Sequence, residues 1–294
     1  MNTKAMLRLM ICVTLCAASA LDLRAQNPAQ PGGGARRGGM PGMFGRGPQT
    51  PPGPPAPVPA EVAMARPTQA EVDAINAELK KLIETSSQKS LLKKYESLLA
   101  VQVPRDNSAI RPAQSFVRTT ERHNGFVETA KSGDFDILFL GDSITDFWQN
   151  NPPAGGAEVF KKHFGDVKVA NFAVGGDPTQ GVLWGLQNGE GQGRKPKAVM
   201  LMIGTNNTGG NSGEEIAEGV GAIVLQLRKD FPDAKIMLLA IFPRGGGPND
   251  SNRQKNEVAN KLIARLHDGK HVFFTDINSK FLKENGSLVG FSTD

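Results

Sequence analysis

The stretch "DILFLGDSIT", residues 136–145, indicates the fold because a nearly continuous apolar run meets a polar turn inside it. Such a run is typical of a strand that is covered on both faces of a sheet. The Asp and Ser that follow are ordinary N-cap residues of a helix. We therefore predict a buried strand that leads directly into a helix.

Four more apolar runs follow, separated by helical segments: "VKVANFAV" (167–174), "AVMLMIG" (198–204), "KIMLLAIF" (235–242) and "HVFFTDI" (271–277). This alternation of strand and helix predicts a parallel sheet in an α/β/α sandwich. Functional residues of such sheets gather on the loops that leave the carboxyl ends of the strands.

The first 25 residues have the pattern of a secretory signal peptide. Lys4 and Arg8 flank the start of an apolar run, "LMICVTLCAASAL", which small residues follow. That run is shorter than the roughly 20 residues that a membrane-spanning helix needs. We therefore expect a secreted or periplasmic protein without stable membrane insertion, with a membrane anchor as the alternative. Cys12 and Cys16 lie inside this segment, so the exported protein would have no cysteine.

Residues 26–60 are dominated by Gly and Pro and contain no acidic residue, so we predict a disordered linker. The formal net charge of +5 resides entirely in the first 60 residues. Residues 61–294 are neutral overall. The basic isoelectric point is therefore no indication of a nucleic-acid partner.

Residues 61–103 predict a helical hairpin. Thr68 and Glu71 match a capping box, and an amphipathic run of Val72, Ile75, Leu79 and Leu82 follows. A second amphipathic piece covers residues 91–99. We expect the two pieces to pack on each other or on the main domain, and a partner-binding coiled coil is the alternative.

Three of the predicted strand ends carry residues that acyl transfer requires. Ser143 follows the first strand, Gly175 and Gly176 follow the second, and Asn206 follows the third. A serine hydroxyl can attack an ester carbonyl, and the backbone N–H of Ser143, the N–H of Gly176 and the Asn206 amide could stabilise the resulting oxyanion. Singly, each motif would also suit a turn or a helix cap. The sequence has no G-x-S-x-G, which excludes the nucleophile elbow of α/β-hydrolases.

The motifs "LFLGDSIT", "NFAVGGD" and "GTNN" resemble the first three motif blocks of the SGNH (GDSL-type) hydrolases. Within that family the likeness is greatest to the catalytic subunits of platelet-activating-factor acetylhydrolase, through "VLWGLQNGE" (182–190) and "FPRGGGPNDSNRQKN" (242–256). The resemblance covers residues 116–294. It implies a flavodoxin-like five-stranded parallel sheet and cleavage of small acyl esters without a metal or an organic cofactor.

By the same resemblance, Ser143 is the nucleophile, and Gly176 and Asn206 are oxyanion donors. The last motif of the family is an Asp followed three residues later by a His. Asp294, in "FSTD" (291–294), resembles the triad aspartate, and the histidine would lie three residues beyond it. We expect structural or surface roles for the histidines at 123, 163, 267 and 271, and their scattered spacing does not suggest a metal site.

Together these patterns predict a secreted serine esterase that removes acetyl or other short acyl groups from a carbohydrate or a small molecule. A binding module with the same fold and no catalytic histidine is the alternative. A phosphate-binding receiver of flavodoxin-like fold is disfavoured because the acidic pocket and the lysine of such a site are not evident.

Overall fold

The computed structural model describes residues 47–103, 105–150 and 156–289. These residues form two compact units. The sheet unit comprises residues 47–63 and 108–289, and the helical unit comprises residues 64–107. The expected signal peptide and Asp294 lie outside the described residues.

The sheet unit is built on five parallel strands in the order β2-β1-β3-β4-β5. The strands are β1 (Ile137–Gly141), β2 (Val169–Asn171), β3 (Ala198–Met202), β4 (Lys235–Leu239) and β5 (Val272–Thr275). Phe139 of β1 is in register with Asn171 on one side and Met200 on the other. This order is that of flavodoxin-like sheets, so the predicted fold class is confirmed.

Six α-helices of the sheet unit connect these strands or precede the first: α5 (Thr120–Ser132), α6 (Ser143–Asp146), α7 (Ala157–Phe164), α8 (Thr179–Gly185), α9 (Gly213–Asp230) and α10 (Ser251–Ile263). Shorter turns are η1 (Ser108–Ile110), η2 (Phe147–Gln149), η3 (Leu186–Glu190), η4 (Thr205–Asn207), η5 (Ala264–Leu266) and η6 (Asn278–Phe281). Side-chain caps stabilise the first turns of α9 and α10. Ser212 and Glu215 form a capping box at α9, and the Asp250 side chain accepts two backbone N–H groups at the start of α10.

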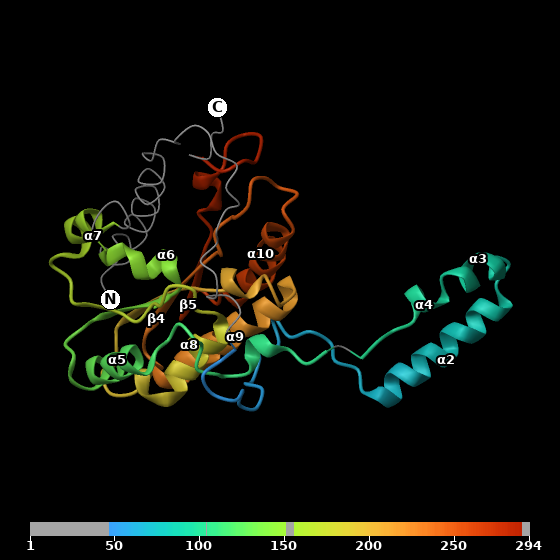
Figure 1. Cartoon of the computed structure of the whole chain (residues 1–294), viewed down its shortest axis with the longest axis horizontal. Helices are drawn as coiled ribbons and strands as arrows, with labels where there is room; N and C mark the ends of the chain where they lie inside the picture. The colour runs from blue at the N-terminus through green and yellow to red at the C-terminus, as the bar shows by residue number, and fades with distance from the viewer. Residues whose placement is uncertain (1–46, 104, 151–155, 290–294) are drawn as a thin grey trace, which may run out of the picture. The chain divides into compact units, whose positions relative to one another are not determined.

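The core lies on both faces of the sheet because successive strand residues point in opposite directions. Leu138 and Leu140 of β1 belong to a cluster with α8, α9 and α10, whereas Phe139 packs on the other face with Trp148 and Phe164. Figure 1 shows α6 and α7 on one side of the sheet and α5, α8 and α9 on the opposite side. This is the three-layer sandwich that the apolar runs predict.

Residues 47–60, the part of the predicted linker that the structure describes, correct the expectation of disorder, and residues 61–63, predicted as the start of the helical hairpin, continue the same segment into the core. The segment is extended, and its N–H groups at Gln49, Gly53 and Ala56 donate to the carbonyl groups of Gln114, Pro112 and Ile110. Val62 is only 2% exposed and belongs to the main core cluster. The composition suggested disorder because Gly and Pro dominate, but an extended chain needs few apolar anchors when a neighbouring backbone satisfies its N–H groups.

Strand β2 ends three residues earlier than its apolar run predicts. The Asn171 side chain accepts the Ala173 N–H at 3.0 Å and donates to the Thr145 carbonyl at 3.0 Å, which turns the chain out of the regular ladder. Backbone bonds to β1 continue irregularly, from Phe172 to Phe139 and from Val174 to Gly141. The chain after β2 is therefore held beside the end of β1.

The helical unit contains α2 (Gln69–Thr85), α3 (Lys89–Lys94) and α4 (Glu96–Leu99). The predicted capping box of Thr68 and Glu71 is present. The Asn76 side chain bonds both the N–H and the carbonyl of Val101, at 2.8 and 2.9 Å, and so ties α2 to the chain after α4.

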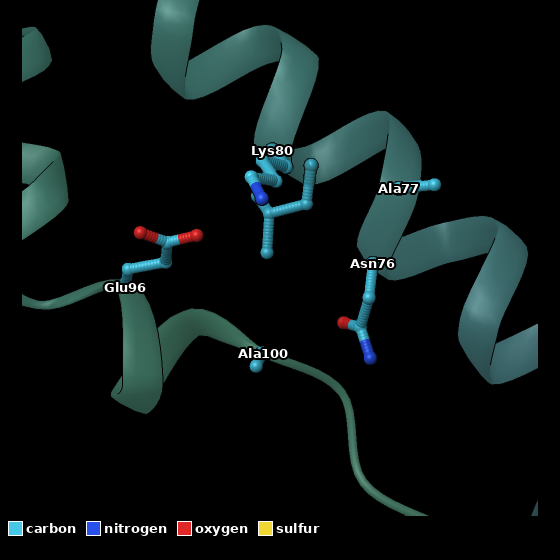
Figure 2. A pocket seen from close by; sticks show the side chains of 6 residues that line it. Asn76, Ala77, Lys80, Glu96 and Ala100 are labelled. Carbon is cyan, nitrogen blue, oxygen red and sulfur yellow. The ribbon is translucent and has the colours of Figure 1, made fainter.

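Figure 2 shows a hollow in the helical unit between α2 and α4, and its lining residues are Asn76, Ala77, Leu79, Lys80, Glu96 and Ala100. It contains no serine, cysteine or histidine, so we assign no chemistry to it. Among the helices that the structure describes, none is long and apolar enough to cross a membrane.

Candidate active site

Ser143 lies at the junction of β1 and α6. It is the first residue of α6, and Asp142 before it caps the helix by accepting the Ile144 N–H at 3.0 Å. Gly141 is required at the end of β1, since a Cβ atom there would lie 2.6 Å from the Met202 carbonyl oxygen. The close approach of β1 to β3 thus brings the half-buried Ser143 to the carboxyl edge of the sheet.

The loop after β2 lies directly beside Ser143. A Cβ atom placed on Gly175 would be 3.6 Å from the Ser143 Cβ. Gly176 has φ +85°, a conformation that only glycine adopts without strain, and the Asp177 N–H closes the turn onto the Val174 carbonyl. The Gly175 N–H donates to the Asp146 carboxylate at 2.8 Å.

Asn206 reaches the same loop from the other side of β1. It belongs to η4, after β3, and its Nδ2 donates to the Asp177 carbonyl at 3.0 Å. Arg244, in the loop after β4, supports η4 by donating to the Thr205 carbonyl at 2.8 Å and to the Thr208 hydroxyl at 3.1 Å. Three strand ends therefore meet around Ser143.

Backbone donors remain available at this junction. Within the described residues, no hydrogen bond uses the backbone N–H of Ser143 or that of Gly176, and both residues are partly exposed. Asn206 Nδ2 carries two N–H groups, of which the bond to Asp177 uses one. Among the described residues these N–H groups have no other hydrogen-bond partner, so they could serve as the donors of the expected oxyanion hole.

Asn207 has a different role from that of its neighbour. It is only 3% exposed, and its Oδ1 accepts the Thr179 N–H while its Nδ2 donates to the Gln180 side chain at 2.9 Å. Those bonds fix the start of α8. Of the two asparagines in "GTNN", only Asn206 therefore offers an amide to the loop beside Ser143.

The carboxyl group of Asp142 is buried immediately before the nucleophile position. Burial raises its pKa to about 7, the nearby Asp177 charge also raises it, and the Ile144 N–H and Arg244 oppose the shift. Among the described residues its Oδ2 has no hydrogen-bond partner. The raised pKa places the titration of the Asp142 carboxyl group near neutral pH.

The rest of the expected triad is not placed by the described residues, because Asp294 lies outside them. Two of the four histidines form side-chain hydrogen bonds with residues other than Ser143. His123 Nδ1 is 2.8 Å from Glu190, and His267 Nδ1 accepts the Phe274 N–H at 3.2 Å. In the part of the chain that the structure describes, no group of His, Cys, Asp and Glu side chains is arranged to hold a metal ion.

Sequence reasoning missed the residues that hold the Gly175–Asp177 loop. Asp177 is fully buried and pairs with Arg118, which also pairs with Glu190. Burial alone would lower the pKa of Arg118, but the two carboxylates raise it above its usual value, so the guanidinium stays charged. The quoted motif "VLWGLQNGE" contained Glu190, yet nothing in its pattern distinguishes a buried glutamate from an exposed one.

A serine and unpaired N–H donors on neighbouring loops at the carboxyl edge of a parallel sheet are the groups that acyl transfer requires. The sequence profile of the GDSL-like lipase/acylhydrolase family matches residues 139–294, more than half of the chain. The chain therefore belongs to this family.

Among curated proteins, the chain is similar to platelet-activating factor acetylhydrolase IB subunit alpha2 of Gallus gallus. The two are 38% identical over 172 residues, which cover 58% of this chain and 72% of the relative. The alpha1 subunit of Homo sapiens is 32% identical over 180 residues, covering 61% of this chain and 74% of that subunit.

Two solved structures are also similar to the chain. One is described as a putative platelet activating factor from Streptococcus pneumonia, with 22% identity, a TM-score of 0.47 and coverage of 57% of this chain and 79% of that one. The other is Est24, a carbohydrate acetylesterase from Sinorhizobium meliloti, with 19% identity, a TM-score of 0.41 and coverage of 53% and 89%.

Proposed function

We propose that this acylhydrolase-family protein is a secreted serine esterase that hydrolyses short acyl esters, acetyl esters above all, of carbohydrates or small molecules. The observation that carries the proposal is the meeting of Ser143 with the free N–H of Gly176 and the amide of Asn206 at one strand edge. The name acetylhydrolase borne by relatives that are 32 to 38% identical supports acetyl as the acyl group.

The reaction follows from these residues. Ser143 Oγ forms a bond to the ester carbonyl carbon and loses its proton to a base, while the carbonyl electrons move onto the oxygen. That oxyanion is bound by the N–H of Ser143, the N–H of Gly176 and Nδ2 of Asn206. Collapse expels the alcohol, and water then releases the acyl group as an acid. In this proposal the base that takes the proton returns it to the oxygen of the leaving alcohol, and Asp294 is the carboxylate of the triad.

The decisive test compares Ser143→Ala with wild type, using p-nitrophenyl esters of two, four and eight acyl carbons. We expect wild type to prefer the acetate and Ser143→Ala to lose kcat on the order of 10⁶-fold. Ser132→Ala is the matched control, because its hydroxyl bonds only the Glu128 carbonyl on the surface of α5. Equal turnover by all three proteins would remove Ser143 from the reaction.

The same assay separates esterase from binding module. If wild type turns over none of the esters, including a peracetylated monosaccharide, the esterase proposal fails and the alternative of a binding module is favoured. Export is tested separately. N-terminal sequencing of the protein from the medium or periplasm should give a start near Gln26, and retention of residues 1–25 would contradict the signal-peptide proposal.

A further inference from the structure

Two arginines four residues apart in the sequence hold the two sides of the loop that carries Gly176. Arg122, in α5, donates to Asp146 at 2.5 Å and to the Ala173 carbonyl at 2.9 Å. Asp146 in turn accepts the Gly175 N–H. The amino side of the loop is thus tied to α5 through a partly exposed ion pair.

Arg118, just before α5, holds the other side and donates hydrogen bonds from all three of its guanidinium nitrogens. Nε and Nη2 donate to Asp177 at 2.9 and 2.7 Å, and Nη1 donates to both oxygens of Glu190 at 2.9 and 2.7 Å. The second Nη2 hydrogen points to the Phe172 carbonyl at 3.3 Å. Ser115 Oγ donates to the remaining Asp177 oxygen. These bonds hold the planar guanidinium in one orientation.

Helix α8 provides the room for both carboxylates. A Cβ atom on Gly181 would lie 2.0 Å from Asp177 Oδ1, and one on Gly185 would lie 2.5 Å from Glu190 Oε2. The glycines occupy successive turns of one helix face, against which the carboxylates pack. The cluster of Ser115, Arg118, Asp177 and Glu190, called here the arginine cluster, fits only because that face carries no side chains.

Asp177 connects the arginine cluster to the proposed oxyanion hole. Its N–H bonds the Val174 carbonyl and so sets the turn that contains Gly176, while its carbonyl accepts Nδ2 of Asn206. Two of the three proposed donors are therefore aimed through the backbone of one residue, whose side chain Arg118 holds. Arg118 precedes residue 139, where the match to the family profile begins.

We propose that Arg118 is a positioning residue for the oxyanion hole, which it orients through Asp177; this rests on the proposed esterase function. A fully buried ion pair contributes little stability compared with apolar packing of the same volume, so stability alone does not account for this cluster. The planar guanidinium of an arginine has N–H donors in fixed directions, so it fixes the orientation of the carboxylates that it binds. A lysine offers the same charge without these fixed directions.

The test is therefore Arg118→Lys, assayed on the full-length protein with p-nitrophenyl acetate. We expect kcat to fall by about 10²-fold, since a misplacement of about 1 Å has that effect, while KM changes less than about threefold. Arg228→Lys is the matched control, because Arg228 also donates to backbone carbonyls, those of Phe231 and Ala234 at the end of α9. That control should keep the wild-type kcat.

Ser115→Ala provides a milder second variant, in case Arg118→Lys does not fold. It removes a single bond to Asp177, and we expect a fall in kcat of several-fold with KM unchanged. A folded Arg118→Lys and a folded Ser115→Ala that both retain wild-type kcat would overturn the proposal. So would a rise in KM with kcat unchanged, since that is loss of substrate binding and not of transition-state stabilisation.

Hydrogen exchange separates this inference from the esterase proposal. The Asp177 amide should exchange at least about tenfold faster in Arg118→Lys than in wild type or Arg228→Lys, because the turn onto Val174 loosens. If wild type proves to have no Ser143-dependent activity, the esterase proposal fails on its own. In that event, unchanged exchange at Asp177 overturns the positioning role, and faster exchange supports Arg118 as the residue that holds the loop.

Discussion

The residues proposed to act on the substrate and the residues that hold them differ in burial. Ser143, Gly176 and Asn206 are partly exposed. Asp177, which follows Gly176 and bonds Asn206, is 0% exposed, and so is Arg118, which pairs with Asp177. Hydrogen-bond donors must be partly exposed to reach a substrate. The charged groups that are proposed to orient these donors are buried, because an ion pair in the protein interior is neither screened by salt nor free to move.

The largest expected effect concerns Asp142, whose buried carboxyl group lies next in sequence to the partly exposed Ser143. Its folded-state pKa of about 7 lies above the ordinary value of 3.8, so between these pH values the folded protein keeps a proton that the unfolded chain has released. The free energy of unfolding therefore falls as pH rises through this window, by at most about 4 kcal/mol, and changes no further from this group above it.

Asp142→Asn removes this titration and keeps an N-cap side chain. We expect the variant to resemble wild type in stability near pH 4 and to be more stable by up to about 4 kcal/mol at pH 8. Urea unfolding at four pH values between 4 and 8 measures the difference. A stability difference that stays constant over this range would contradict the raised pKa.

The neighbouring asparagines sharpen the comparison next. Asn206→Ala should lower kcat by about 10² to 10³-fold with little change in KM or melting temperature, because the amide acts in the transition state. Asn207→Ala should instead lower stability by about 1 to 3 kcal/mol, because it leaves the buried Thr179 N–H unsatisfied. Steady-state kinetics and thermal melts of both variants test these two roles. A loss of kcat in Asn207→Ala and a loss of stability in Asn206→Ala would contradict the roles assigned to the two asparagines.

The smallest effect is expected at the extended segment of residues 47–63. Val62 packs against Gly221 of α9 within the main core cluster. Val62→Ala should cost about 2 kcal/mol of unfolding free energy, from lost apolar burial and the cavity that remains. The exposed Glu61→Ala is the control. If chemical denaturation of Val62→Ala and Glu61→Ala gave the same midpoint as wild type, the segment would not be part of the core.

The strands and their order of appearance could be predicted because buried parallel strands leave continuous apolar runs in the sequence. The junction of Ser143, Gly176 and Asn206 could be predicted because carboxyl ends of parallel strands share one edge. The end of β2 at Asn171 could not, since it depends on side-chain bonds to Thr145 and Ala173.

The sequence did not predict that part of the linker packs on the core, and it did not predict the arginine cluster. One reason explains both. Both depend on contacts between residues far apart in the chain, such as Gln49 with Gln114 and Arg118 with Glu190. A sequence pattern records local periodicity, and it does not record which charge or carbonyl will be buried against which partner.

The most direct test of the central claim is a crystal structure of the full-length protein after reaction with diethyl p-nitrophenyl phosphate, whose phosphoryl oxygen mimics the oxyanion. The account predicts a covalent bond to Ser143 Oγ, with that oxygen 2.7–3.1 Å from the N–H of Ser143, the N–H of Gly176 and Nδ2 of Asn206. An adduct on another residue, or an oxygen turned away from Gly176 and Asn206, would contradict it.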